Sequence, residues 1–177
     1  MNVHDTSLRE TALQLPFTDA VLLDRIMRHD LDKAAIDLPF SQRLARENGW
    51  TAEYALRFIH EYKRFIYLTC ISPDEMTPSD EVDQAWHLHL VYSRDYLGEF
   101  CPRVLKRELH HGPAEGGTYE AQRFEQNYTR TLKLYGQVFG EKSPKDIWPP
   151  ASIRFIAPEK YRRVSKREAH VCPLFCL

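Results

Sequence analysis

Glycine is scarce in this chain, with only seven residues among 177, whereas proline occurs eleven times. A fold rich in β-strands needs many tight turns, and glycine is the residue that best supplies them. The low glycine content, together with many long side chains, therefore favours helices. The length suits one domain with its own hydrophobic core and is short for two.

The chain also lacks an excess of charge and a long apolar run. Its 24 basic and 25 acidic side chains leave a formal net charge of −1, so we expect no general attraction to nucleic acid. No segment reaches the roughly 18 consecutive apolar residues that span a bilayer. The polar first residues, MNVHDTSLRETALQLPF, do not form a secretory signal. We therefore predict a cytoplasmic protein without a membrane span.

Cysteine is too sparse for a disulfide scaffold, so we expect reduced thiols. Cys70 and Cys101 have apolar neighbours, which indicates small buried side chains rather than nucleophiles. Near the C-terminus, His170, Cys172 and Cys176 offer a soft-metal site or a disulfide. Their spacing is not the CxxC of a zinc ribbon, and docking of the apolar tail on the domain is the commoner arrangement.

Hydrophobic periodicity and capping residues predict an all-α fold, an irregular bundle of about five to six helices. We expect a single helical domain over residues 1–150 and an extended basic tail over 151–177, with a solvated basic cluster at Lys160–Arg167. The tail includes a short extended segment at Ile153–Ile156. The expected helices are 18 to about 30, 41–47, 51–70, 77–101, 103–109 and 118–139.

Capping residues define most of the expected helix starts. Thr18, Thr51 and Thr118 each precede an apolar periodic run and are predicted N-caps. Thr77 is the predicted N-cap of the next helix, because Pro78 then occupies the first helical position, where its missing N–H costs nothing.

The expected 77–101 helix carries the sequence VDQAWHLHL. At about 100° per residue, Asp83 and His87 share one face, whereas His89 points roughly 200° away from His87. Two histidines in such positions cannot bind one metal ion from a regular helix. His89 belongs instead to a neighbouring stripe with Trp86.

A second histidine pair follows in the loop His110-His111-Gly112-Pro113. Two histidines and one carboxylate bind a divalent metal with positions left open, so Asp83, His87 and either His110 or His111 are candidate ligands for an ion such as zinc. Asp83 can equally fix the tautomer of His87 as its hydrogen-bond acceptor. The structural alternative is a simple Asp83–His87 pair on the helix, with the loop histidines capping the preceding helix.

Several segments together resemble the glycine-rich domain-containing protein family: EYKRFIYLTC, VDQAWHLHL, HHGP, YTRTLKLYGQVFG and DIWPP. The resemblance extends over residues 61–150. The glycine-rich region that gives the family its name has no counterpart here. The resemblance implies a shared fold and a shared histidine motif, and it supplies no reaction.

Two functional interpretations follow. The favoured one is a non-enzymatic binding or scaffold domain, in which the histidine helix is core and an aromatic-rich surface binds a protein partner. The alternative is a metal-binding or metal-dependent, hydrolase-like protein that uses Asp83, His87 and the His110-His111 loop. The sequence does not decide whether the protein is an enzyme.

Overall fold

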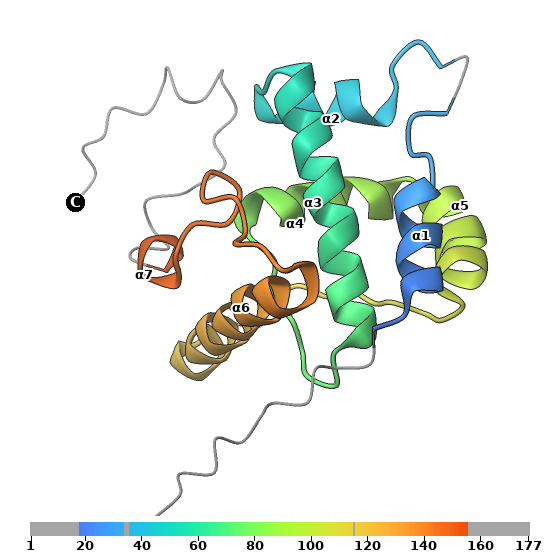
Figure 1. Cartoon of the computed structure of the whole chain (residues 1–177). Helices are drawn as coiled ribbons and strands as arrows, with labels where there is room; N and C mark the ends of the chain where they lie inside the picture. The colour runs from blue at the N-terminus through green and yellow to red at the C-terminus, as the bar shows by residue number, and fades with distance from the viewer. Residues whose placement is uncertain (1–17, 34–35, 115, 156–177) are drawn as a thin grey trace, which may run out of the picture.

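The computed structural model describes residues 18–33, 36–114 and 116–155. These ranges contain helices and no strand, which confirms the all-α prediction (Figure 1). The helices are α1 (Ala20–Arg28), α2 (Phe40–Asn48), α3 (Ala52–Ile71), α4 (Asp80–Val91), α5 (Ser93–Asp95), the π-helix η1 (Tyr96–Leu105), α6 (Thr118–Phe139) and α7 (Ala151–Arg154).

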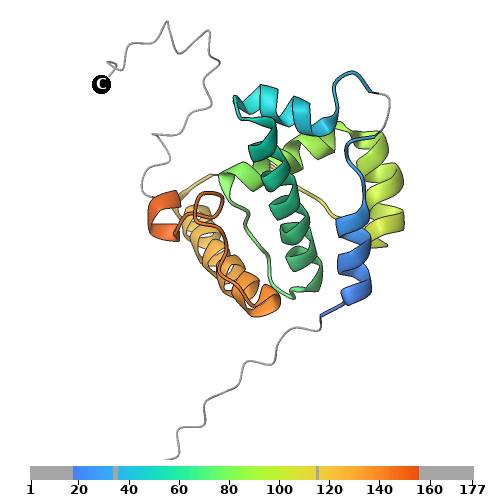
Figure 2. The same ribbon diagram turned by 45° about the horizontal axis from the view of Figure 1, so that its top comes forward.

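Helix α3 is the centre of the bundle. It packs against α1, α2, α4 and α6, and the two ribbon views show α1 and α6 on opposite sides of it (Figures 1 and 2). Helix η1 lies against α1. Because α3 is surrounded, apolar and aromatic residues recur over most of its circumference, and ten of its side chains are buried.

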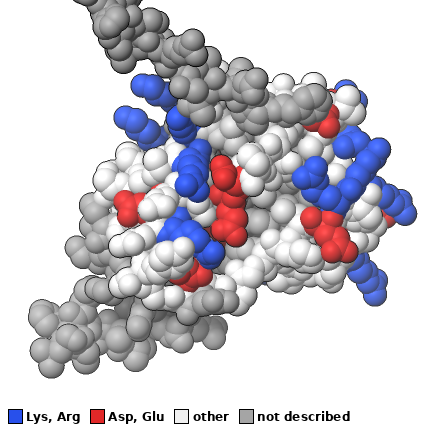
Figure 3. All heavy atoms as spheres, turned by 90° about the horizontal axis from the view of Figure 1, so that it is seen from below, with Lys and Arg blue, Asp and Glu red and all other residues white. Residues whose placement is uncertain are grey.

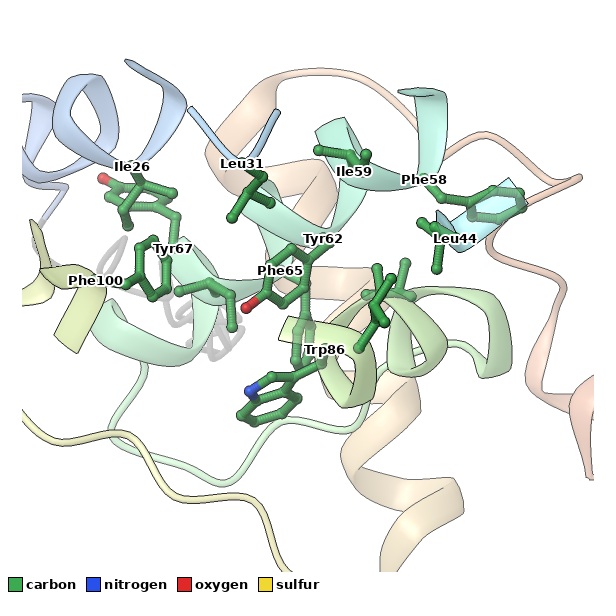
Figure 4. Close-up of a cluster of buried hydrophobic side chains, with 14 of the residues drawn as sticks. Ile26, Leu31, Leu44, Phe58, Ile59, Tyr62, Phe65, Tyr67, Trp86 and Phe100 are labelled. Atoms are coloured by element: carbon green, nitrogen blue, oxygen red, sulfur yellow. The ribbon is translucent and has the colours of Figure 1, made fainter. Parts of the chain in front are cut away.

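Aromatic side chains make up a large part of the core, together with aliphatic ones (Figure 4). Phe58, Tyr62 and Phe65 of α3 are fully buried, and Phe100 of η1 and Trp86 of α4 pack into the same cluster. Burial of one such side chain contributes about 1.5–3 kcal/mol relative to exposure. The aromatic layer therefore fixes the position of α4, which carries the histidine motif.

Some predicted helix ends are confirmed. Thr51 caps α3, and its hydroxyl accepts from the Tyr54 N–H at 3.2 Å. Helix α6 covers 118–139 as expected, although its N-cap is Gly117 and Thr118 is its first residue. Gly49 ends α2 at φ 71°, a left-handed conformation that glycine adopts without strain.

Besides Thr118, two further predicted caps are wrong. The N-cap of α1 is Asp19 rather than Thr18, because the Asp19 carboxylate accepts from the Leu22 N–H at 2.8 Å. The N-cap of α4 is Ser79 rather than Thr77. The backbone N–H of Thr77 instead donates to the Thr131 hydroxyl of α6, so a tertiary contact holds this residue outside the helix.

The single helix predicted over 77–101 is also wrong. Helix α4 ends at Val91, and Tyr92, with φ −78° and ψ 52°, breaks the helical path. The chain continues through α5 into η1, which contains Gly98 and Pro102 and ends before Lys106 at φ 58°. The helix expected over 103–109 is thus only the end of η1. Proline lacks the N–H that would continue an α-helical ladder, and here it lies within the wider π-helix.

The chain after residue 150 begins differently from the expected extended tail. Residues 151–154 form the short helix α7, in which the N–H groups of Ile153 and Arg154 donate to the Pro150 carbonyl. The extended segment expected from Ile153 is therefore helical at its start. The basic cluster Lys160–Arg167 and the residues His170, Cys172 and Cys176 lie outside the described residues.

Acidic and basic side chains lie next to each other on the face seen in Figure 3. Surface ion pairs among the described residues include Arg57 with Asp146 at 2.7 Å and Arg103 with Glu99 at 3.1 Å. Among the described helices, none combines the length and the apolar composition that crossing a membrane requires.

Candidate functional site

The two histidines of the HLH motif belong to two different clusters. His87 lies with Asp83 and His111, and His89 lies with His29 and Asp95. Trp86 and His89 face the core, with exposed fractions of 5% and 0%. The side chain of His87 is half exposed on another face of α4. The helical phase of the sequence had indicated this separation.

Asp83 is the centre of the first cluster. Its Oδ1 lies 3.0 Å from the Nε2 of His111, and its Oδ2 lies 3.4 Å from the Nδ1 of His87. One ligand atom from each residue lies within 4.8 Å of the others. The structure thus brings together three of the four residues that the sequence singled out.

An aromatic stack places His111 in this cluster. Its ring lies 4.2 Å from the Trp86 ring at an interplanar angle of 9°, and 4.6 Å from the His87 ring at 24°. The indole N–H of Trp86 donates to the Tyr96 hydroxyl, which donates to the Leu109 carbonyl at 2.7 Å. The loop is therefore attached to the core two residues before His111.

His110 does not join the cluster. Its side chain is 83% exposed, and its Nε2 lies 3.1 Å from the exposed carboxylate of Glu108. The two adjacent histidines point in different directions, and only His111 turns toward α4.

The second cluster is deeper. Asp95 Oδ2 accepts hydrogen bonds from the Nε2 atoms of His29 at 2.8 Å and His89 at 2.9 Å, and Asp95 Oδ1 lies 2.5 Å from the Lys33 ammonium. The Tyr62 hydroxyl bonds to the other ring nitrogen of His89 at 2.8 Å. One tautomer of each ring satisfies every one of these contacts, with Tyr62 donating to Nδ1 and each Nε2–H donating to Asp95.

Burial and hydrogen bonding act in opposite directions on Asp95. Burial alone raises the pKa of a carboxyl, but the hydrogen bonds from His89, Lys33 and His29 outweigh it and hold the pKa of Asp95 well below its usual range. Burial lowers the pKa of His89, so this imidazole is neutral at pH 7. The cluster is an ionised carboxylate held by neutral and cationic donors.

Sequence reasoning missed this second cluster. On one continuous helix, His89 and Asp95 would lie about 9 Å apart along the axis and on different faces. They meet because the chain turns at Tyr92. His29 comes from α1, 66 residues away from Asp95, and no local pattern indicates that contact.

Each cluster contains one buried polar atom that makes no hydrogen bond within the described part of the chain, and the surroundings of these two atoms differ. In the second cluster the atom is Asp95 Oδ1, which has the Lys33 ammonium 2.5 Å away as an ion-pair partner. In the second, each ring nitrogen that faces Asp95 makes a hydrogen bond. In the first, His111 Nε2 is buried and makes no hydrogen bond within the described part of the chain, because its contact with Asp83 is short but poorly aligned. A buried nitrogen that lacks a hydrogen-bond partner is a feature that calls for a ligand or another explanation.

The two described cysteines fit the expectation of buried, inert thiols. Cys70 and Cys101 are both free and buried. Burial raises the pKa of Cys70 to about 11, and it also raises the pKa of Cys101. Both are therefore thiols rather than thiolates at neutral pH.

Searches of curated proteins and of solved structures gave no significant match. A family model described as UCP032817-like matches residues 32–135. This range is more than half of the chain and contains both histidines of α4, as well as Asp83, Asp95 and His111, but not His29. The chain belongs to the UCP032817-like family.

Proposed function

We propose that this protein binds one divalent metal ion, with Asp83, His87 and His111 as its ligands. The observation that carries the proposal is the buried Nε2 of His111, which lies 3.0 Å from Asp83 Oδ1 without forming a hydrogen bond. A metal ion between them would be coordinated by His111 Nε2 and by Asp83 Oδ1, and would give each atom a partner.

The chemistry of the three donors favours zinc. Two imidazoles and one carboxylate are ligands of catalytic zinc sites, where metal–nitrogen bonds are about 2.0–2.1 Å. The three candidate ligand atoms lie within 4.8 Å of one another, so modest side-chain rotations would bring them to coordination distance. The His111 ring is already oriented by its stacking on Trp86. Metal binding would therefore cost less side-chain conformational entropy than it would for a freely rotating histidine.

The site is open on one side, because the side chain of His87 is 52% exposed and that of Asp83 is 23% exposed. Three protein ligands would leave a coordination position for water or a substrate. A metal ion in such a position lowers the pKa of its bound water and polarises carbonyl or phosphoryl groups. Hydrolysis is therefore the reaction class that we propose for testing once metal binding is established.

Metal content and zinc titration of the tag-free protein test the proposal. We expect one equivalent of zinc in the wild type, and loss of that zinc in the His87→Ala and His111→Ala variants. Replacement of zinc by Co²⁺ provides a second readout, since the visible absorption of Co²⁺ reports its coordination number and geometry.

His110→Ala is the matched control, because His110 is adjacent in sequence but points to Glu108 on the surface. This variant should keep its zinc. A folded wild type that takes up no metal would refute the proposal, as would an equal loss of metal in the His110→Ala and His111→Ala variants.

The scaffold role, the glycine-rich domain family and the cytoplasmic location stay predictions. For the scaffold role, a pull-down with the wild type and with a zinc-free His111→Ala variant would show whether any partner depends on the metal site.

A further inference from the structure

A cavity of about 370 Å³ lies between the segment that follows α1 and the junction of α4 with α5. This volume falls in the range of roughly 300–1,000 Å³ that small-molecule sites occupy. The cavity borders the Asp95 cluster and shares no lining residue with the Asp83–His87–His111 cluster. It therefore concerns a different part of the molecule from the proposed metal site.

The walls of the cavity are largely apolar. Leu31 and Phe40 are buried at its base, whereas Ile36 and Val91 line it with exposed fractions of 48% and 76%. The free energy falls when an apolar group covers apolar surface that is in contact with water. These walls favour an aliphatic chain as the occupant.

The charged lining residues favour an anion. Asp95 is already held by Lys33, by the buried His89 and by the partly buried His29, so its charge is compensated. Arg94 is exposed and lines the same cavity, and its guanidinium makes no ion pair within the described residues. One positive charge at the cavity is therefore left without a counter-charge.

We propose that this cavity binds a small amphiphilic carboxylate. Its aliphatic chain would lie on Leu31, Ile36 and Val91, and its carboxylate would accept hydrogen bonds from Arg94. A planar guanidinium suits a carboxylate well, because two parallel N–H groups can donate to its two oxygens. The Lys33 ammonium has three donors, so it can contact the ligand while it keeps its ion pair with Asp95.

Calorimetric titration with sodium octanoate tests the proposal. We expect saturable binding of one octanoate per chain. Octan-1-ol and octylammonium present the same chain with a neutral and a cationic head, and both should bind at least about tenfold more weakly, since a charge-assisted hydrogen bond is worth about 1.5–3 kcal/mol.

Two pairs of variants separate the head group from the chain. Arg94→Ala should weaken octanoate binding about tenfold, whereas Arg103→Ala, which removes another exposed arginine that pairs with Glu99, should not. Val91→Asp should abolish binding, whereas Leu97→Asp, at an exposed position outside the cavity, should leave it intact. All four positions are on the surface, so circular dichroism should show an unchanged fold.

Equal binding of octanol and octanoate would overturn the proposal, and so would equal affinity in the Arg94→Ala and Arg103→Ala variants. The His111→Ala variant should bind octanoate like the wild type. This result keeps the cavity separate from the zinc hypothesis, because either one can fail while the other stands.

Discussion

At the scale of single residues, Asp95 connects three parts of the chain. It accepts from His29 of the α1 end and from His89 of α4, and it pairs with Lys33. A buried carboxylate is tolerated only where donors satisfy it. The hydrogen bonds that depress the pKa of Asp95 are therefore also the contacts that attach α1 and α5 to α4.

These groups predict an acid-sensitive fold. Burial lowers the pKa of His89 below its ordinary value of 6.5. As the pH falls through 6.5, His89 is therefore protonated in the unfolded chain before it is protonated in the folded chain, which favours unfolding. The depressed pKa of Asp95 adds stability above its ordinary value of 3.8, and this stability is lost as the pH falls below that value toward the folded-state pKa. Both effects lower the free energy of unfolding in acid.

Urea unfolding followed by circular dichroism between pH 4 and 8 measures this effect. In the His89→Gln variant, the decrease in the free energy of unfolding from pH 7 to pH 5 should be smaller than in the wild type. The decrease should not vanish, because burial also lowers the pKa of His60. Identical slopes in the two proteins would contradict the assignment of a buried neutral imidazole at position 89.

At the scale of elements, the start of α4 determines where Asp83 and His87 lie. Ser79 is fully buried, and its hydroxyl accepts from the Val82 N–H at 3.3 Å. Asp80 and Glu81 in the first turn interact favourably with the helix dipole. The cap thus fixes the first turn of the helix that presents the candidate ligands.

Ser79→Ala should lower the free energy of unfolding by about 1 kcal/mol, because it removes this cap. Thr77→Val provides the matched comparison. It removes the hydroxyl at the position that the sequence had indicated as the cap, and the side-chain volume stays nearly the same. We expect a smaller loss than for Ser79→Ala, because the contact with Thr131 is made by the backbone N–H of residue 77, which valine retains. If chemical denaturation showed a larger loss of unfolding free energy in Thr77→Val than in Ser79→Ala, the cap would lie at Thr77 instead.

At the scale of the whole molecule, a second buried carboxylate attaches the C-terminal part of the described chain to α3. Glu61 of α3 is 4% exposed. It accepts from the Trp148 indole N–H at 2.8 Å and from the Tyr135 hydroxyl of α6 at 3.2 Å. The Arg64 guanidinium lies 3.6 Å from the same carboxylate. Asp95 and Glu61 therefore play matching roles: Asp95 attaches α1 and α5 to α4, and Glu61 attaches α6 and the DIWPP segment to α3.

Trp148→Phe should lower the free energy of unfolding by about 2–4 kcal/mol, because it leaves a buried carboxylate oxygen without its donor and opens a small cavity. Trp50→Phe is the control. Trp50 is partly exposed, stacks on Phe58 at 4.3 Å and forms no hydrogen bond through its indole within the described residues. Trp50→Phe should lower the free energy of unfolding by markedly less than Trp148→Phe. Equal decreases in the two variants, measured by thermal unfolding, would argue against the role of the Glu61 contact.

Particular residues show which features of the fold and of the candidate site could be predicted from the sequence. The periodic apolar positions of 52–71 and 118–139 and the Thr51 cap indicated real helices. The spacing of Asp83 and His87 indicated that they share a face, and they do. All of these depend on interactions within about four residues, which the sequence displays directly.

The sequence by itself thus determined the helical class, the boundaries of α1, α2, α3 and α6 to within about two residues, and the separation of His87 from His89. Only the tertiary structure decided that His111 rather than His110 joins Asp83, that the helix breaks at Tyr92 and that His29 meets Asp95. The reason is that packing selects these features: His111 stacks on Trp86, and Asp95 is satisfied by a donor 66 residues away. Contacts between distant segments leave no periodic trace in the sequence.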